Sequence, residues 1–161
     1  MYKIHFTFDK SRKADSFKKF LSKQYLNYSP SKCDVIVVSG GDGFMLKTLK
    51  KYYKFGKPFY GVNCGSFGFL MNKYDHKSLN DKIKRSKQLT INPLMLITKI
   101  KKKIKKIIAI NEISLFRQSR QTASLSLKLG KKTIIKNLIG DGVLVSTPAG
   151  STAYNLSVDG P

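Results

Sequence analysis

Residues 35–43 read Val35-Ile36-Val37-Val38-Ser39-Gly40-Gly41-Asp42-Gly43, an apolar run that leads directly into a glycine-rich turn. Such a run predicts a fully buried strand of a parallel sheet. Open α/β sheets bind ligands at the carboxyl ends of their strands, and glycines let the backbone approach phosphate oxygens closely. A carboxylate beside phosphates is repulsive unless it binds a metal or accepts a proton. Asp42 therefore indicates phosphoryl transfer to a hydroxyl, with a purely structural turn as the open alternative.

The first half of the chain alternates predicted strands with predicted helices. Strands are expected at residues 3–8, 35–39 and 58–63, and helices at residues 13–24, 44–53 and 77–85. The helix that follows the turn would direct its N-terminus, which favours anions, toward Asp42. This alternation predicts an α/β domain with a parallel sheet covered by helices.

The second half has the pattern of an antiparallel sheet. Strands are expected at residues 90–100, 104–116, 123–129, 133–138 and 143–146, with hairpin turns at residues 101–103 and 130–132. A domain boundary is therefore expected near Lys87. The last residues, Ser157-Val158-Asp159-Gly160-Pro161, have the pattern of a turn that leads onward, so we expect the sequence to be a fragment.

Composition narrows the function classes. The 161 residues carry a formal net charge of +22, but the lysines are spread along the chain and only four basic residues are arginine, the residue that base reading favours. We therefore expect a solvated lysine surface and no specific nucleic acid. No apolar run approaches the roughly 20 residues of a membrane span. Cys33 and Cys64 lack CxxC spacing, which indicates a reduced, cytoplasmic protein without a cysteine metal site.

Three further stretches carry candidate chemistry. A predicted strand ends in closely spaced glycines, Gly61-Val62-Asn63-Cys64-Gly65-Ser66-Phe67-Gly68-Phe69-Leu70. Asn111 and Glu112 interrupt an apolar run, where two adjacent polar residues are costly to bury. Asp141 lies between two glycines and precedes Ser146-Thr147-Pro148-Ala149-Gly150-Ser151-Thr152-Ala153-Tyr154.

In this order, the four stretches resemble the NAD kinase family, whose members phosphorylate the adenosine 2′-hydroxyl of NAD to make NADP. The resemblance covers essentially the whole chain. It implies a Rossmann-like, phosphofructokinase-like α/β domain at residues 1–87 and an NAD-binding, all-β sandwich domain, incomplete here, at residues 88–161. It also implies ATP as co-substrate, Mg²⁺ or another divalent cation as cofactor, and a homodimer or homotetramer. No residue is assigned as a metal ligand.

The resemblance assigns the phosphoryl-transfer residues to the first half. Asp42 would be the catalytic base, a role that typically contributes about 10²–10⁴-fold to the rate. Gly43 would bind substrate through its backbone. Lys47 would pair with a phosphate of either nucleotide, and a solvent-facing helix lysine is the alternative.

The same resemblance implies that the second half binds NAD. The Asn111 amide would pair with adenine and the Glu112 carboxylate would bridge two ribose hydroxyls, with placement on an exposed edge strand as the alternative. Asp141 would reach NAD, in an oligomer from a neighbouring subunit, or would simply lie in a hairpin turn. Ser151 or Thr152 would cap a helix. The remaining assigned residues are Ala149, Thr152, Ala153, Tyr154, Asn155, Leu156 and Ser157.

Those remaining residues have distinct expected roles. The small Ala149 and Ala153 would leave room for adenine, Tyr154 would stack on a ring, and the Thr152 and Ser157 hydroxyls would face the nucleotide. As an alternative, the tyrosine is a core aromatic and the hydroxyls serve only to cap the helix.

Two positions depart from the family pattern, and two other functions stay open. Phe67 stands where the family usually has Leu, and Asp159 stands where it commonly has a second Gly before Pro161. Family members also continue beyond this point, so the pocket wall and the dimer interface would be incomplete. The alternatives are a lipid or sugar kinase that shares the glycine turn, and an inactive NAD-binding fragment.

Overall fold

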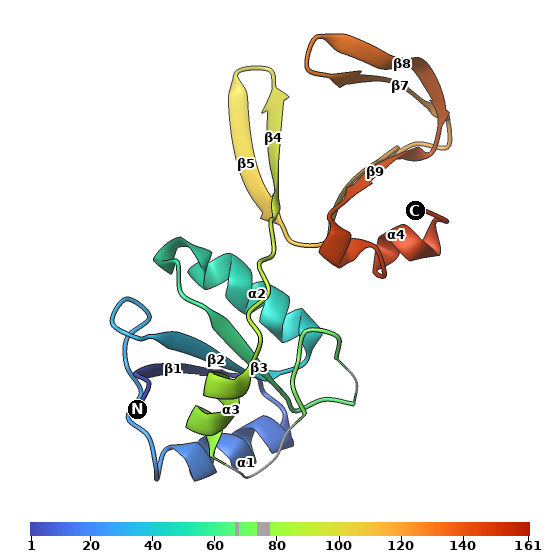
Figure 1. The fold of residues 1–161 in the computed structure, drawn as a ribbon. Helices are drawn as coiled ribbons and strands as arrows, with labels where there is room; N and C mark the ends of the chain where they lie inside the picture. The colour runs from blue at the N-terminus through green and yellow to red at the C-terminus, as the bar shows by residue number, and fades with distance from the viewer. Residues whose placement is uncertain (67, 74–77) are drawn as a thin grey trace. The chain divides into compact units, whose positions relative to one another are not determined.

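The computed structural model describes residues 1–66, 68–73 and 78–161, which form two compact units, residues 1–90 and 91–161 (Figure 1). The first unit is a parallel sheet with helices, and the second consists of antiparallel strand pairs. The predicted fold class, an α/β domain followed by a β domain, is confirmed. No helix within these ranges is long and apolar enough to cross a membrane.

The sheet of the first unit is built around the apolar run. Strand β2 (Val35–Gly40) lies between β1 (Ile4–Phe8) and β3 (Phe59–Asn63), and both neighbours run parallel to it. Every residue of β2 is buried, because helices cover both faces of the sheet. The predicted buried strand of a parallel sheet is confirmed, and its carboxyl end carries the glycine turn.

The helices divide between the two faces (Figure 1). Helices α1 (Arg12–Leu21) and α3 (Leu79–Arg85) pack Phe17, Leu21 and Leu79 against the face that carries Val35 and Val37. Helix α2 (Asp42–Tyr52) packs Met45 against Ile36 and Val38 on the other face and continues into the 3-10 helix η1 (Tyr53–Phe55). The predicted helix over residues 13–24 ends early, at Leu21, and Lys77 of the predicted third helix lies outside the described residues.

The second unit contains three antiparallel pairs. Strands β4 (Leu94–Ile100) and β5 (Lys103–Ala109) form one hairpin, and β7 (Ala123–Leu129) and β8 (Lys132–Gly140) form another. Strand β6 (Glu112–Phe116) pairs with β9 (Gly142–Ser146). Both predicted hairpin turns are confirmed, with left-handed residues at Lys101 (φ 53°) and Gly130 (φ 59°). The 3-10 helix η2 (Pro148–Gly150) and the short α4 (Tyr154–Ser157) follow.

The single strand predicted over residues 104–116 is wrong. The chain leaves the β4–β5 hairpin at Ala109 and begins a new pairing with β9 at Glu112. Between them, the Asn111 carbonyl accepts a hydrogen bond from Thr147 N at 2.7 Å. The adjacent polar residues therefore mark a change of strand partner within an otherwise continuous apolar run.

Many large apolar side chains of the second unit are exposed. Ala109 and Ile110 are its buried apolar residues in the part of the chain that the structure describes. Exposed apolar residues occur on all three strand pairs, for example Ile97, Leu115 and Ile139. The strand pairs thus present uncovered apolar faces.

Candidate active site

The Asp42 carboxylate is held in place by the loop that follows β3. Asp42 is the first residue of α2, at the carboxyl end of β2. Its Oδ2 accepts a hydrogen bond from Phe69 N at 2.8 Å, and its Oδ1 accepts one from Leu70 N at 3.0 Å. Two backbone donors fix the orientation of the side chain, so the carboxylate lies between the ends of two parallel strands.

Glycines make this arrangement possible, because they let the backbone lie close to Asp42 and to the loop after β3. A methyl group at Gly68 would lie 2.9 Å from Asp42 Oδ1, and one at Gly61 would lie 2.7 Å from the Leu70 carbonyl oxygen. The loop is joined to the turn by a hydrogen bond from Cys64 N to Gly40 O at 2.9 Å. The second glycine-rich stretch therefore packs against the first. Phe67, the departure from the family pattern, lies outside the described residues.

Gly43 and Lys47 are both exposed on α2. A methyl group at Gly43 would meet no atom within 4 Å, so packing gives no reason for a glycine there. Among the residues that the structure describes, no carboxylate forms an ion pair with Lys47. Both positions are open to a ligand.

Sequence reasoning missed Asp9, which follows β1. Its Oδ1 accepts a hydrogen bond from Ser11 N at 2.8 Å, and its Oδ2 lies 2.8 Å from where a methyl group on Gly40 would be. Asp9 thus stands beside the turn that carries Asp42. The available signal was an acidic residue directly after a predicted parallel strand, but Asp9 lacks the glycine-rich turn that singled out Asp42.

Cys64, which lies beside the glycine turn, is not a nucleophile. Burial, followed by the nearby Asp9 carboxylate, raises the pKa of the Cys64 thiol to about 11, and Lys13 opposes this only weakly. The thiol therefore stays protonated near neutral pH, and thiolate chemistry is not expected there.

In the second unit, Glu112 has one carboxylate oxygen, Oε2, that is buried. Its Oε2 has no hydrogen-bond partner within the described parts of the chain. A buried polar atom without a partner is costly, and such atoms in native proteins call for an explanation such as a missing ligand. Glu112 lies opposite Ser146 in the β6–β9 pair, directly after Asn111.

A tight turn seats residues 147–150 against Asn111. The buried Thr147 Oγ1 donates to Ile110 O at 2.7 Å and accepts from Gly150 N at 3.1 Å. A methyl group at Gly150 would overlap the Asn111 carbonyl, so only glycine fits there. The structure therefore brings the Asn111-Glu112 pair together with the start of the fourth stretch.

The predicted helix cap is wrong. Ser151 and Thr152 do not cap the last helix, because α4 begins later, at Tyr154, and Ala153 precedes it without a side-chain cap. The capping side chain is Thr147, which caps the N-terminus of η2 by accepting a hydrogen bond from Gly150 N. Pro148 is the first residue of η2, and the hydrogen-bonded turns after it continue to Ala153. Helix α4 therefore begins only at Tyr154.

The remaining candidate residues of the second unit differ in their exposure and in their side-chain contacts. Tyr154 is 45% exposed, and its ring meets Phe116 edge-on with centroids 6.1 Å apart. Asp141 lies at the bend between β8 and β9 and forms an ion pair with Arg117. The alternative of a hairpin turn is wrong, because β8 pairs with β7 and β9 pairs with β6. Ala149, Thr152, Leu156 and Ser157 are exposed, and Ala153 is half-buried.

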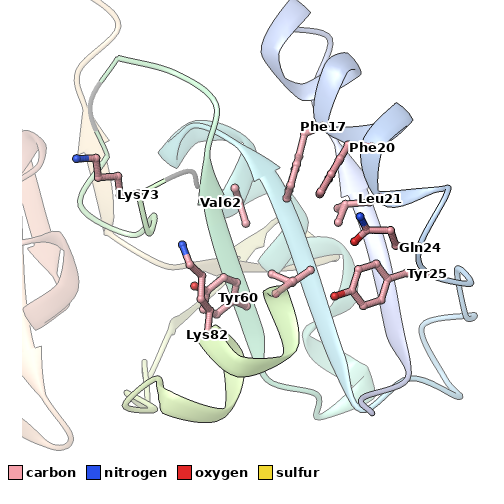
Figure 2. Close-up of a pocket in the computed structure, with 10 residues that line it drawn as sticks. Phe17, Phe20, Leu21, Gln24, Tyr25, Tyr60, Val62, Lys73 and Lys82 are labelled. Atoms are coloured by element: carbon pink, nitrogen blue, oxygen red, sulfur yellow. The ribbon is translucent and has the colours of Figure 1, made fainter. Parts of the chain in front are cut away.

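A hollow between α1, β3 and α3 does not belong to these candidates (Figure 2). Core side chains such as Phe17 and Tyr60 form its walls, and Lys73 and Lys82 lie along it. Its free volume of about 10 Å³ holds about one water molecule, so it is far too small for a nucleotide.

Comparison with protein-family models decides the family. Residues 1–86 match the ATP-NAD kinase N-terminal domain, and residues 110–161 match the ATP-NAD kinase C-terminal domain. The chain belongs to the ATP-NAD kinase family.

Curated ATP-NAD kinase relatives match almost the whole chain. The NAD kinase of Brucella suis is 42% identical over 159 residues, which cover 98% of this chain and 62% of the relative. That of Zymomonas mobilis is 45% identical over 152 residues, covering 92% of this chain and 59% of the relative. The chain thus spans about three fifths of the length of these relatives.

A solved structure of an NADH kinase is similar in fold. Yeast NADH kinase, solved in complex with NADH, is 28% identical, with a TM-score of 0.65. The match covers 80% of this chain and 40% of the yeast chain.

The departure from the ATP-NAD kinase pattern at Asp159 has a structural counterpart. Asp159 is left-handed, with φ 54°, a conformation that glycine adopts without cost and Asp tolerates better than most residues. The turn is held by the buried Asn155, whose Nδ2 donates to Pro161 O at 2.8 Å and whose carbonyl accepts from Gly160 N. Asn155, a predicted NAD-binding residue, thus has its amide nitrogen engaged in this turn.

Proposed function

We propose that this chain carries the catalytic aspartate and the NAD-binding residues of an NAD kinase, which transfers the terminal phosphoryl group of ATP to the adenosine 2′-hydroxyl of NAD. Family membership and the relatives' names support the reaction class. The observation that carries the proposal is the Asp42 carboxylate, oriented by two backbone donors at the carboxyl end of a buried parallel strand.

The proposed chemistry follows because the Asp42 carboxylate can accept further hydrogen bonds. An ionised carboxylate offers about four lone-pair sites, so two N–H donors leave room for a substrate hydroxyl. As the 2′-oxygen attacks the terminal phosphorus, the O–P bond forms and the bond from phosphorus to the bridging oxygen of ADP breaks. The hydroxyl proton moves to Asp42, and the products are NADP and ADP.

A divalent cation would neutralise charge on the transferred phosphoryl group. Mg²⁺ in phosphoryl-transfer enzymes is held by one or two carboxylates together with substrate phosphates. Asp9 fits that requirement, because it lies beside the glycine turn and its Oδ2 accepts no hydrogen bond from any described residue.

Glu112 would hold the acceptor. Its unpartnered Oε2 suits the O–H donors of a ribose, and the neighbouring Asn111 amide suits an adenine edge. The exposed Tyr154 ring is available for stacking. Asp141, Ala149, Thr152, Ala153, Asn155, Leu156 and Ser157 complete the proposed NAD-binding set.

A lipid or sugar kinase that shares the glycine turn is a weaker proposal, because residues 110–161 match the C-terminal domain of the NAD kinase family itself. We also expect a homo-oligomer, since the uncovered apolar faces of the second unit favour association. A cytoplasmic location remains an expectation from the two free cysteines.

The test is formation of NADP from NAD, ATP and Mg²⁺ by the purified chain, with Asp42→Asn as the variant. The variant should lower the turnover number by about 10²–10⁴-fold, because the base is lost while one acceptor oxygen for the loop amides remains. Saturable NAD binding without turnover would support the proposed NAD site and would reject catalysis by this chain. Neither turnover nor NAD binding would reject the proposal.

A further inference from the structure

Asn72 joins the loop after β3 to the edge of the parallel sheet. Its backbone N donates to Gly61 O at 2.9 Å, and its carbonyl accepts from Asn63 N at 2.8 Å. These two bonds form a parallel bridge beside Val62 of β3, an edge strand of the three-stranded sheet. The side chain adds a third bond, because Asn72 Nδ2 also donates to Gly61 O, at 3.0 Å. Asn72 therefore anchors the loop through both its backbone and its side chain.

The anchored end of the loop lies close to the two donors that orient Asp42. Phe69 N and Leu70 N donate to the two oxygens of the Asp42 carboxylate, at 2.8 and 3.0 Å. Asn72 follows Leu70 by only two residues, which span at most about 7 Å of chain. A fixed Asn72 therefore restricts where the Phe69 and Leu70 N–H groups can lie.

The Asn72 amide acts apart from the apolar packing of the same segment. The Leu70 and Met71 side chains pack against the cluster that contains Val38 and Met45. Apolar contacts are not directional, whereas a hydrogen bond fixes both distance and angle. Asn72 itself is exposed, so truncation of its side chain leaves no cavity in the core. The amide thus sets the position of the loop along β3 without contributing to the core.

We propose that Asn72 is a positioning residue for phosphoryl transfer, because its side-chain amide holds the loop where Phe69 N and Leu70 N meet the Asp42 carboxylate. The inference rests on the proposed function, in which Asp42 is the base. Asn72 acts through the loop backbone and not by contact with a substrate. Transfer of the hydroxyl proton requires a base in a defined place, and a displacement of about 1 Å can lower the rate by about 10²-fold.

The sheet itself offers a matched control at its other edge. Asn27 forms a parallel bridge beside Ile4 of β1, and its Oδ1 accepts a hydrogen bond from Phe6 N at 3.0 Å. Asn27 is exposed, as Asn72 is. Asn27→Ala and Asn72→Ala therefore each remove one side-chain hydrogen bond to an edge strand, but only Asn72 lies beside the donors to Asp42.

The first test is hydrogen exchange of the Phe69 and Leu70 amides, followed by NMR on the purified chain without nucleotide. Asn72→Ala should speed the exchange of both amides about 3–10-fold, the factor expected for the net contribution of one hydrogen bond. Asn27→Ala should change both rates by less than about twofold. Equal acceleration in the two variants, or none in Asn72→Ala, would overturn the proposal.

The second test is the steady-state rate of NADP formation from NAD, ATP and Mg²⁺. Asn72→Ala should lower kcat by at least about threefold and leave both KM values within about twofold, because the base is displaced while no substrate contact is lost. Asn27→Ala should keep the kcat of the parent. An Asn72→Ala variant with the parent's kcat would overturn the proposal, as would a rise in KM without a fall in kcat.

The two tests separate the role of Asn72 from the reaction itself. If the parent chain makes no NADP but the amide exchange follows the predicted pattern, the control of Asp42 by Asn72 is supported and the proposed reaction fails. If NADP forms while both the exchange and the kcat ignore Asn72→Ala, the reaction stands and the role of Asn72 is rejected.

Discussion

Glu112 is the residue for which we propose a ligand-binding role that destabilises the protein without ligand. Its buried Oε2 has no hydrogen-bond partner among the residues that the structure describes, and it lies next to the point where the chain changes strand partner. Such an atom costs about 1–3 kcal/mol in the absence of ligand. The residue is therefore expected to be retained for binding and not for folding.

Glu112→Leu should raise the thermal midpoint of the chain without ligand, because the substitution removes a buried acceptor that has no partner there. It should weaken NAD binding by at least about tenfold, because the same acceptor is lost from the complex with NAD. Thermal unfolding and NAD titration of the same preparations check this. Ser114→Leu, an exposed substitution on the same strand, serves as the control. A variant that loses stability and keeps its NAD affinity would contradict the role given to Glu112.

Asp159 gives a second prediction for a single residue. Asp159→Gly should stabilise the chain by about 0.5–1 kcal/mol, because a left-handed residue is replaced by one without a Cβ. Val158→Gly is the matched control. Val158 has φ −116°, so glycine there should lower the free energy of unfolding by about 0.5–1 kcal/mol. Urea unfolding measures both, and effects of the same sign would refute the argument.

Among the secondary-structure elements, the end of β3 and the loop after it control the geometry around Asp42. The loop donates both hydrogen bonds to the carboxylate, and it fits only because Gly61 and Gly68 lack side chains. The helix α2 supplies Asp42, and the loop orients it. The site is therefore a joint product of two segments far apart in sequence.

Gly61→Ala should lower the free energy of unfolding by about 1–3 kcal/mol, because the new methyl group meets a backbone oxygen of the loop and the Met45 and Met71 side chains. Gly43→Ala meets no neighbour and lies in a helix, so it should stabilise by about 0.5–1 kcal/mol. Chemical denaturation of the two variants compares them directly. A Gly61→Ala variant as stable as the parent would show that the loop adjusts freely.

The sequence was sufficient to predict elements with strong local patterns. The apolar run of β2, the helix after the turn and the two hairpin turns follow from hydrophobic periodicity and from the polar stretches that interrupt it at residues 101–103 and 130–132. The break at Asn111 was not predictable, because the hydrogen bond that ends the pairing comes from Thr147, far along the chain. The role of Thr147 as the cap was missed for the same reason, since Ser151 and Thr152 have equal local propensity. Asp9 was missed although it directly follows a predicted strand, and the structure shows that it lies beside the glycine turn.

For the whole molecule, charge is the dominant property. The net charge is +22 on 161 residues, and most of the lysines are exposed, so the positive side chains repel one another. Such repulsion destabilises the folded state and is screened within about 10 Å at 0.1 M salt. The same field attracts anionic nucleotides from solution.

Raising NaCl from about 20 to 200 mM should therefore raise the thermal midpoint and weaken nucleotide binding, because both effects are screened. Thermal unfolding and AMP-PNP titration across this range measure the two trends. Sucrose at matched osmolality should leave nucleotide affinity unchanged. A midpoint that falls with salt would show that attractive ion pairs outweigh the repulsion.

The change of strand partner at Asn111 also bears on how this fold tolerates alteration. The candidate NAD-binding residues lie at the junction between strand pairs, whereas the turns at Lys101 and Gly130 close the opposite ends of the two hairpins. Residues at those tips can be replaced or lengthened without entering the junction. They are the natural positions for a fluorescent label or an inserted peptide, and the places where related sequences can differ in length while the nucleotide contacts keep their spacing.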